Sequence, residues 1–282
     1  MKEVIESAYA KINWYLAVGG RRSDGYHDIL SIMQTVSLAD TVTIRPGRET
    51  GICIRCHGEV PVPSGEENLA WRAAERYYSR AGMKPAVTIE LHKRIPTGSG
   101  LAGGSADAAA VLRGLNAAFD QKMSHEALLG IAAEIGSDVP FCLYGGVAVV
   151  QGRGERLTAV APTPKRYLVL VNAGEHVSTA EAYARLDKST RVDPIGNCDE
   201  LLEVLHRDDI PLREDLLRND FAPLVLPLCP GATDALRILR ELGGVAQMSG
   251  SGSTVYAVFS DEDTARYAAS KFTGNVFCVT TL

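Results

Sequence analysis

The sequence predicts an α+β fold built from two domains. A strand pattern, a glycine-rich turn and a helix pattern follow one another between residues 87 and 119, and period-2 alternation dominates the residues before them. The end of the chain alternates helix and strand patterns in the order of a split βαβ unit. With 282 residues, 46% of them hydrophobic, the chain can form two cores. The boundary is expected near Ala161, which gives domains of residues 1–161 and 162–282.

Charge and composition exclude several classes of protein. A formal net charge of -5 and a pI near 5.7 oppose a protein that reads a nucleic-acid backbone, which needs a basic face. The acidic residues of the N-terminus oppose a signal peptide, and no apolar run has transmembrane length. The six cysteines are scattered, so we expect them to be reduced, and Cys53 and Cys56 lack the partners of a zinc site. A cytoplasmic protein without nucleic-acid or membrane partners is expected, as a monomer or homodimer.

The first strand is expected from Ser7 to Val18. One face is apolar, and the other carries polar side chains: Tyr9, Lys11, Asn13 and Tyr15. A lysine on the open face of a strand is usually just solvated, so this pattern alone does not make Lys11 catalytic. A turn cluster at 19–27 follows, and then further strands at 32–38 and 42–44.

Three helices of the first domain carry start signals. Asn68 is the expected N-cap of a helix that Gly82 ends, and Ser124 opens a helix that Gly136 stops. Asp138 is a natural N-cap for the short helix that follows, because Pro140 lies two residues further on. A strand bounded by Gly145 and Gly154 completes the domain.

The glycine-rich turn lies between the strand at 87–91 and a helix for which Ser105 is the expected N-cap. Its glycines let the backbone approach a ligand, and the free N–H groups of the helix start favour an anion such as phosphate. The turn could instead serve only to reverse the chain. It also matches the dinucleotide motif GxGxxG, with Asp120 near the ribose-binding position, but Asp120 ends a helix pattern rather than a strand. No GK[ST] follows, which excludes a Walker-type loop.

The second domain begins with a buried strand at 167–171. Ser178 and Glu181 form a capping box ahead of a helix through Tyr183 and Leu186. Helices are expected at 201–206, 230–242 and 263–271, and strands at 245–248, 255–259 and 275–280. The turn at 249–253 could be an ordinary hairpin, although its N–H groups also suit an anion.

Four motifs occur together in one order: Ala8-Tyr-Ala-Lys-Ile-Asn13, Asp24-Gly-Tyr-His27, Pro96-x-Gly-x-Gly-Leu-Ala-Gly-Gly-Ser-x-Asp-Ala-Ala109 and Gly136-Ser-Asp-Val-Pro-Phe141. This set resembles the GHMP kinases, which include galactokinase and homoserine, mevalonate and phosphomevalonate kinases. The resemblance spans most of the chain. It implies a ribosomal-protein-S5-like N-terminal domain, a ferredoxin-like (split βαβ) C-terminal domain, and ATP-dependent phosphorylation of an alcohol.

The resemblance also implies roles for individual residues. Lys11 would stabilise the transferred phosphoryl group, Asp138 would be the base, and Asn68 would border the adenine. The residues expected to hold the ATP phosphates are Pro96, Thr97, Gly98, Ser99, Gly100, Leu101, Ala102, Gly103, Gly104, Ser105 and Ala106. The turn of Ser249, Gly250, Ser251 and Gly252 would close beside them.

The motifs with Tyr26 and His27 are most similar to those of kinases that act on cytidine diphosphate-linked methylerythritol. Tyr26 would stack on the cytosine and His27 would hydrogen-bond its edge. Asn13, Thr179 and Tyr183 would lie near the substrate, although capping and packing explain Thr179 and Tyr183 nearly as well. Another GHMP kinase, such as homoserine kinase, is the alternative. A non-catalytic RNA-binding module is a second alternative, which the acidic charge opposes.

ATP is expected to arrive as its Mg²⁺ complex. Related kinases hold the metal with a serine of the glycine loop. Here Ala106 replaces the second serine of the usual pair, so Ser105 is a doubtful ligand, and the sequence specifies no metal site.

Overall fold

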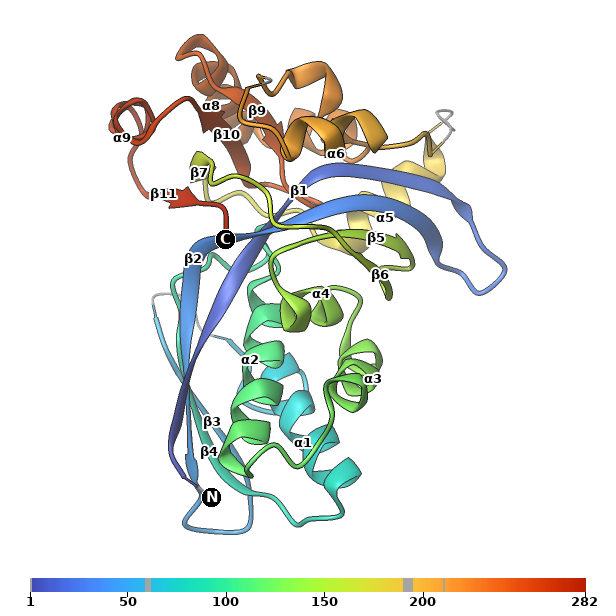
Figure 1. Ribbon diagram of the computed structural model, residues 1–282, viewed down its shortest axis with the longest axis vertical. Coiled ribbons are helices and arrows are strands. Elements are labelled where there is room, and N and C mark those ends of the chain that lie inside the picture. The colour runs from blue at the N-terminus through green and yellow to red at the C-terminus, as the bar shows by residue number, and fades with distance from the viewer. Residues whose placement is uncertain (1, 59–61, 190–194, 210) are drawn as a thin grey trace. The chain divides into compact units, whose positions relative to one another are not determined.

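The computed structural model describes residues 2–58, 62–189, 195–209 and 211–282 (Figure 1). Its chain forms two compact units that do not follow sequence order. Unit 1 comprises 1–10, 38–97 and 102–145, and unit 2 comprises 11–37, 98–101 and 146–282. Two long strands, β1 (Val4–Arg21) and β2 (His27–Pro46), therefore contribute to both units. The boundary near Ala161 remains a prediction.

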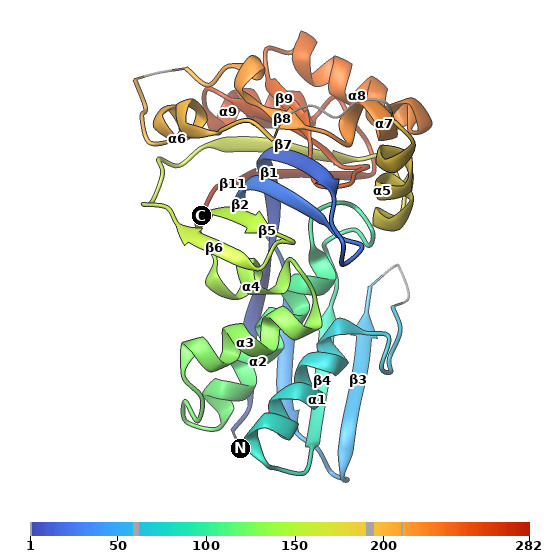
Figure 2. The same ribbon diagram turned by 90° about the vertical axis from the view of Figure 1, so that its right-hand side faces the viewer.

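Unit 1 is a sheet covered by helices. Strand β3 (Gly51–His57) pairs in parallel with β4 (Ala86–His92), which pairs antiparallel with residues 41–46 of β2. The helices are α1 (Leu69–Ala81), α2 (Gly103–Ala118), α3 (His125–Ile135) and the short α4 (Val139–Tyr144). Figure 2 shows α1 lying across β3 and β4. Alternate strand residues such as Ile89 thus point into a core beneath the helices.

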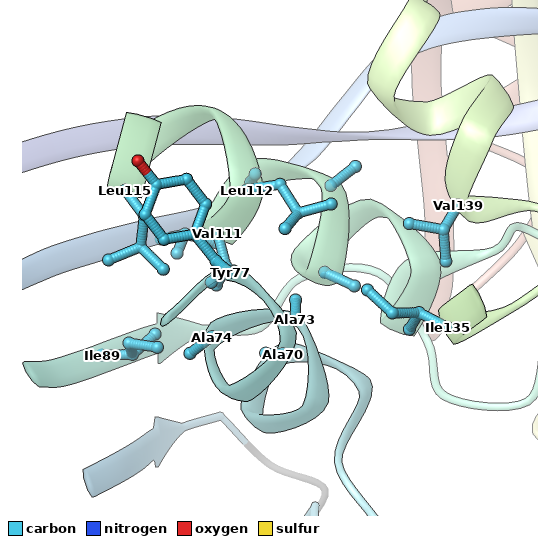
Figure 3. Close-up of a cluster of buried hydrophobic side chains, with 14 of the residues drawn as sticks. Ala70, Ala73, Ala74, Tyr77, Ile89, Val111, Leu112, Leu115, Ile135 and Val139 are labelled. Carbon is cyan, nitrogen blue, oxygen red and sulfur yellow. The ribbon is translucent and has the colours of Figure 1, made fainter. Parts of the chain in front are cut away.

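The core of unit 1 joins small residues of α1 to large ones of α2 (Figure 3). Ala70, Ala73 and Ala74 are fully buried, as are Leu112 and Leu115 of α2. Alanines allow two helix backbones to approach closely, and branched side chains then fill the remaining space. This packing holds α2, whose first residues belong to the glycine-rich turn.

Several local predictions for unit 1 are confirmed. The Asn68 side chain accepts from Ala70 N at 2.9 Å, and the Ser124 side chain accepts from Ala127 N at 3.2 Å. Gly82 ends α1 in the left-handed conformation, with φ +65°. The expected separate strands at 32–38 and 42–44 form one continuous strand, β2, and β3 was not expected.

The predicted N-cap at Ser105 is wrong. Helix α2 begins at Gly103, and its N-cap is Ala102, which has a left-handed φ of +58° and a side chain that cannot cap. A Cβ on Gly103 would lie 2.9 Å from Ile95 Cγ2, so only glycine fits where the helix starts this early. Ser105 consequently lies inside the first turn of the helix.

The C-terminal part of unit 2 is a four-stranded antiparallel sheet. Its order is β11 (Asn275–Thr280), β7 (Tyr167–Asn172), β10 (Val255–Phe259) and β9 (Val245–Met248). Helices α8 (Pro230–Glu241) and α9 (Glu262–Ala269) pack against it (Figure 1). The order places the first strand between the fourth and the third, which is the ferredoxin-like split βαβ arrangement. This prediction is confirmed.

Other strands of unit 2 pair with the parts of β1 and β2 that belong to the same unit. Strand β1 pairs in parallel with β8 (Arg218–Asn219), and β2 pairs with β5 (Val147–Gly152), which continues to β6 (Arg156–Ala159). The helical segments are α5 (Thr179–Lys188), α6 (Asp199–Leu205), η1 (Glu214–Leu216), α7 (Ala222–Val225) and η2 (Leu226–Leu228). Fully buried Trp14 of β1 packs edge-on against Tyr256 of β10, with ring centroids 5.5 Å apart.

Over the described ranges, no single helix is both long and apolar enough to cross a membrane. One sharply bent pair, 222–228 with 230–241, meets the length and composition test jointly.

Candidate active site

Lys11 is buried, with an exposed fraction of 4%. Its ammonium group donates to Asn13 Oδ1 at 2.7 Å and to the carbonyl of Gly100 at 3.1 Å. Asn13 in turn donates to Ser31 Oγ at 2.8 Å, and Ser31 donates to the carbonyl of Tyr15. Lys11 and Asn13, on the predicted polar face of β1, are therefore buried rather than solvated, and they fix one positive charge against the glycine-rich turn.

A second glycine turn packs directly on the first. Gly250 N donates to Asn13 Oδ1 at 3.0 Å, and Ser249 Oγ donates to the carbonyl of Gly100 at 3.1 Å. A Cβ on Gly100 would lie 2.1 Å from the carbonyl oxygen of Ser249, and one on Gly250 would lie 3.2 Å from Lys11 Nζ. Only glycine fits at this contact, because both positions also have positive φ, +79° and +56°. The predicted turns at 98–101 and 249–252 thus meet around Lys11.

Two buried side chains outside the motifs support these contacts: Asn219 holds the second turn, and Tyr256 holds the backbone of Asn13. Asn219 donates to the carbonyls of Met248 and Gly250 at 2.7 and 2.9 Å. The hydroxyl of Tyr256 donates to the carbonyl of Asn13 at 2.9 Å. Complete burial raises the pKa of Tyr256, so its hydroxyl remains a proton donor. Both contacts join segments far apart in sequence, so no local pattern could have predicted them.

The loop after β7 also contacts the glycine turns. Glu175 accepts from the backbone of Gly231 and Ala232 at 2.8 and 2.9 Å, which satisfies N–H groups at the start of α8. Its own carbonyl accepts from the hydroxyl of Ser253. A nitrogen of the His176 ring lies 3.2 Å from the carbonyl of Gly98. The loop therefore ties the second glycine turn to the sheet and touches the first.

Helix α5 borders the same region. Its predicted capping residue is confirmed, because Ser178 accepts from Glu181 N at 3.1 Å. Thr179 Oγ1 lies 3.0 Å from Ser251 Oγ, so the first residue of the helix reaches the second glycine turn. Thr179 is exposed, and its hydroxyl is not used to cap the helix.

An aromatic cluster lies where β2 begins. The rings of His27 and Tyr183 stack with centroids 5.0 Å apart and an interplanar angle of 26°, and Phe221 packs edge-on against Tyr183 at 4.9 Å. His27 Nε2 lies 2.8 Å from Asp187 Oδ1. Tyr26 is 53% exposed, with the guanidinium of Arg153 over its ring at 4.8 Å. The predicted residues His27 and Tyr183 are in contact, and Tyr26 offers a flat, open face.

In unit 1, a buried charge cluster holds both ends of the glycine-rich segment. Lys93 bonds to Asp40 and, at 2.5 Å, to Asp107 of α2. Asp40 also accepts from the backbone of Arg94 and Ile95 at 2.5 and 2.8 Å, just before the glycines. The cluster therefore links the strand end to the start of α2 within one unit.

The cluster contains two carboxylates and one ammonium group, and burial shifts their proton affinities. Burial raises the pKa of Asp107 to about 7; the charge of Lys93 opposes this rise, and that of Asp40 adds to it. Burial alone would lower the pKa of Lys93, but the two carboxylates outweigh it and raise that pKa. Asp107 Oδ1 has no hydrogen-bond partner among the described residues.

The start of α2 has the features of an anion site within unit 1. Ala102 provides no side-chain cap, and Gly103 and Gly104 have no side chain to cover the first turn. The N–H groups of that turn carry the positive end of the helix dipole. This accords with the predicted grip on phosphate by residues of the same segment.

Asp138 lies at the N-cap position of α4 but does not fill the capping role predicted for it. It has helical dihedral angles, φ -88° and ψ -12°, and no side-chain capping bond to α4. Asn68 caps α1 with its oxygen and donates to the carbonyl of Pro63 at 2.7 Å. Both of these predicted site residues belong to unit 1, as do Pro96, Thr97 and Ala102–Ala106.

A dedicated metal site is not built by the described residues, since no three of their His, Cys, Asp or Glu side chains gather as ligands. Ser105 lies in the first turn of α2.

Comparison with known proteins now defines the class. Residues 68–146 match the family described as GHMP kinases N terminal domain, and residues 201–276 match GHMP kinases C terminal. The chain belongs to the GHMP kinase family.

Within that family, several similar proteins share one name. The chain is 45% identical to the 4-diphosphocytidyl-2-C-methyl-D-erythritol kinase of Moorella thermoacetica, over 94% of this chain and 93% of the relative. It is 39% identical to the enzyme of the same name from Rhodococcus jostii, over 99% and 91%. A crystal structure of 4-(cytidine 5'-diphospho)-2C-methyl-D-erythritol kinase superposes with a TM-score of 0.83 at 34% identity, covering 99% of both chains. The homoserine kinase of Cytophaga hutchinsonii, 22% identical with a TM-score of 0.75 over 98% and 95%, shares the fold.

Proposed function

We propose that this protein phosphorylates the 2-hydroxyl of 4-diphosphocytidyl-2-C-methyl-D-erythritol with ATP, giving the 2-phosphate and ADP in the non-mevalonate isoprenoid pathway. The observation that carries the proposal is the placement of Lys11 between two glycine turns, in a unit that also holds a stacked His27 and Tyr183. The first feature suits phosphoryl transfer and the second suits a pyrimidine. The names of the relatives agree with both.

The reaction needs positioning and charge stabilisation more than covalent chemistry. The substrate hydroxyl oxygen attacks the γ-phosphorus while the bond to the bridging oxygen of ADP breaks, and the hydroxyl proton leaves to a base. Lys11 is fixed by hydrogen bonds in a buried site, so its charge can stabilise the equatorial oxygens without first reorganising. Residues Pro96–Ala106 and Ser249–Gly252 would supply backbone N–H groups to the phosphates.

Asp138 is proposed as the base that accepts the hydroxyl proton. It is the aspartate of the Gly136-Ser-Asp-Val-Pro-Phe141 motif, within the residues that match the GHMP kinase N-terminal domain. An aspartate carboxylate can accept the proton of a substrate hydroxyl. Asn68 is proposed to border the adenine.

The pyrimidine is proposed to bind at the start of β2. Tyr26 offers an exposed ring face, His27 a ring nitrogen, and Tyr183 a ring that Phe221 already orients. A flat base needs such a combination of stacking surface and directional polar groups. Asn13 and Thr179 are proposed to contact the rest of the substrate.

A substrate panel with radiolabelled ATP tests this function. We expect label to pass to cytidine diphosphate-linked methylerythritol and not to homoserine or mevalonate, with one ADP formed for each phosphoester. Transfer to homoserine alone would establish the alternative within the family. Salt-dependent binding of RNA by a chain without kinase activity would establish the RNA-binding alternative.

The remaining features of the proposal concern its surroundings. ATP would enter as its Mg²⁺ complex, the metal being held by phosphate oxygens. A cytoplasmic location, as a monomer or homodimer without nucleic-acid or membrane partners, fits the free cysteines and the acidic charge.

A further inference from the structure

Helix α5 supplies two groups to His27. Tyr183 and Asp187 are separated by one turn, so they lie on the same face of the helix. Tyr183 stacks on the imidazole, and Asp187 Oδ1 lies 2.8 Å from its Nε2. The His27 side chain is 7% exposed and that of Asp187 is 35% exposed. Stacking on Tyr183 therefore fixes the plane of the imidazole, and the contact with Asp187 fixes the rotation of the ring within that plane.

The carboxylate determines which ring nitrogen carries hydrogen. A carboxylate of an aspartate only accepts hydrogen bonds, so Nε2 must be the donor in this contact. In a neutral imidazole, a hydrogen on Nε2 leaves Nδ1 with a lone pair that accepts. Whenever the ring is neutral, the second nitrogen of His27 is thus set as an acceptor by a residue that lies on another element.

An acceptor at Nδ1 distinguishes the two common pyrimidines. Cytosine has an amino donor at its 4-position, whereas uracil has a carbonyl acceptor there. A lone pair on Nδ1 attracts the amino group and opposes the carbonyl oxygen. A site that places an acceptor opposite an acceptor rejects the wrong base strongly, because both groups stay unpaired.

We infer that Asp187 is a positioning residue for base specificity: it fixes the Nε2-protonated, correctly oriented form of His27, whose Nδ1 then accepts from the amino group of cytosine. This inference rests on the proposed function, because it assigns His27 to the base of a cytidine diphosphate. Asp187 lies outside the sequence motifs, and its effect on His27 would make the base site bind cytidine compounds more tightly than uridine compounds.

The first test measures binding of cytidine and uridine diphosphates by calorimetry. In Asp187→Ala we expect the Kd for cytidine diphosphate to rise about tenfold and that for uridine diphosphate to change little, since one charge-assisted contact is lost. Turnover at saturating substrate should stay within about threefold of wild type, so the effect falls on KM. Asp187→Glu should restore part of the discrimination.

Glu181→Ala is the matched control. Glu181 is an acidic residue on the same helix, and its carboxylate pairs with Arg185 rather than with His27. It should leave both dissociation constants unchanged. If Asp187→Ala alters stability as Glu181→Ala does and leaves the ratio of the two constants intact, Asp187 only anchors α5 and the inference is wrong.

The second test reads the tautomer directly in the ligand-free protein. With ¹⁵N-labelled histidine at about pH 8.5, where an ordinary imidazole is neutral, the His27 ring should show a protonated Nε2 and an unprotonated Nδ1. His27→Gln assigns the resonance. A proton on Nδ1 would overturn the inference whatever the substrate. If the wild-type protein binds neither nucleotide, the proposed function fails. The spectrum still shows which nitrogen of the His27 ring carries the hydrogen.

Discussion

The packing of one glycine turn on another makes a quantitative prediction. In Gly100→Ala the new methyl group would lie 2.1 Å from the carbonyl oxygen of Ser249, whereas ordinary contact begins at 3.4 Å. Backbone lies on both sides, so the two turns must separate by about 1 Å. We expect three costs: about 1–2 kcal/mol for left-handed φ, about 1–3 kcal/mol for overpacking, and up to about 1 kcal/mol from stretching the contacts of Lys11 and Ser249 to Gly100.

Gly274→Ala measures the cost of the left-handed φ alone. Gly274 has φ +85°, close to the +79° of Gly100, it also belongs to unit 2, and a Cβ there meets no atom within 4 Å. It should lose about 1–2 kcal/mol of unfolding free energy, against roughly 2–6 kcal/mol for Gly100→Ala. Replacing glycine by alanine changes the entropy of the unfolded chain equally in both variants, so this effect cancels when their unfolding free energies are compared.

The two tryptophans make the assay specific. Trp14 is fully buried in unit 2 and Trp71 lies on α1 of unit 1. In a Trp71→Phe background, urea unfolding followed by fluorescence therefore reports unit 2. If Gly100→Ala costs no more than Gly274→Ala, the two turns do not pack as described, and the argument for a rigid phosphate cradle around Lys11 fails.

Three further predictions concern charge. Lys11→Met should lower kcat about 10²–10³-fold, as loss of a preorganised charge does. It should lower the unfolding free energy by no more than about 1 kcal/mol, because the desolvation cost of a buried ammonium also disappears. Retained turnover would contradict the role proposed for Lys11. Asp138→Asn should lose about 10²–10⁴-fold in turnover with ATP affinity nearly unchanged, as single-turnover and binding measurements would show; a loss of ATP binding instead would place Asp138 in the nucleotide site. The pKa of Asp107 is raised to about 7 in the folded protein from an ordinary 3.8, so the protonated form is favoured by folding and stability falls as pH rises between these values. Asp107→Asn should remove this fall, a difference of roughly 2–4 kcal/mol between pH 4 and 8 in urea titrations, and equal pH profiles for the two proteins would refute the assignment.

Elements with local signals could be predicted from sequence. The capping residues Asn68, Ser124 and Ser178 are confirmed, because a cap depends on side chains within three residues of the helix start. Strand β11 was expected at the same residues where it lies, since a short apolar run follows Gly274 there. The ferredoxin-like order of unit 2 followed from these elements.

Elements that depend on distant partners could not be predicted. Strand β3 is defined by its parallel pairing with β4. Only Ile54 of its side chains is buried, so buried and exposed residues alternate weakly along this strand. The start of α2 at Gly103 rather than Ser105 depends on Ile95, which excludes any side chain there. A capping residue is only a local preference, and tertiary contact overrode it.

The candidate site shows the same division. Recognisable motifs contain the glycine turns, Lys11 and His27. The sequence therefore predicted these residues together as one site. Asn219, Tyr256 and Asp187 have no motif, because each acts on a segment far away in the sequence. Residues that act through such distant contacts are selected by geometry, which sequence spacing does not record.

The measurement that tests the central claim most directly is a crystal structure with a non-hydrolysable ATP analogue and cytidine diphosphate. The account predicts that the terminal phosphate lies within about 3 Å of Lys11 Nζ, against the N–H groups of the two glycine turns, with the cytosine beside His27. A triphosphate bound elsewhere, with the turns around Lys11 carrying no phosphate, would contradict it.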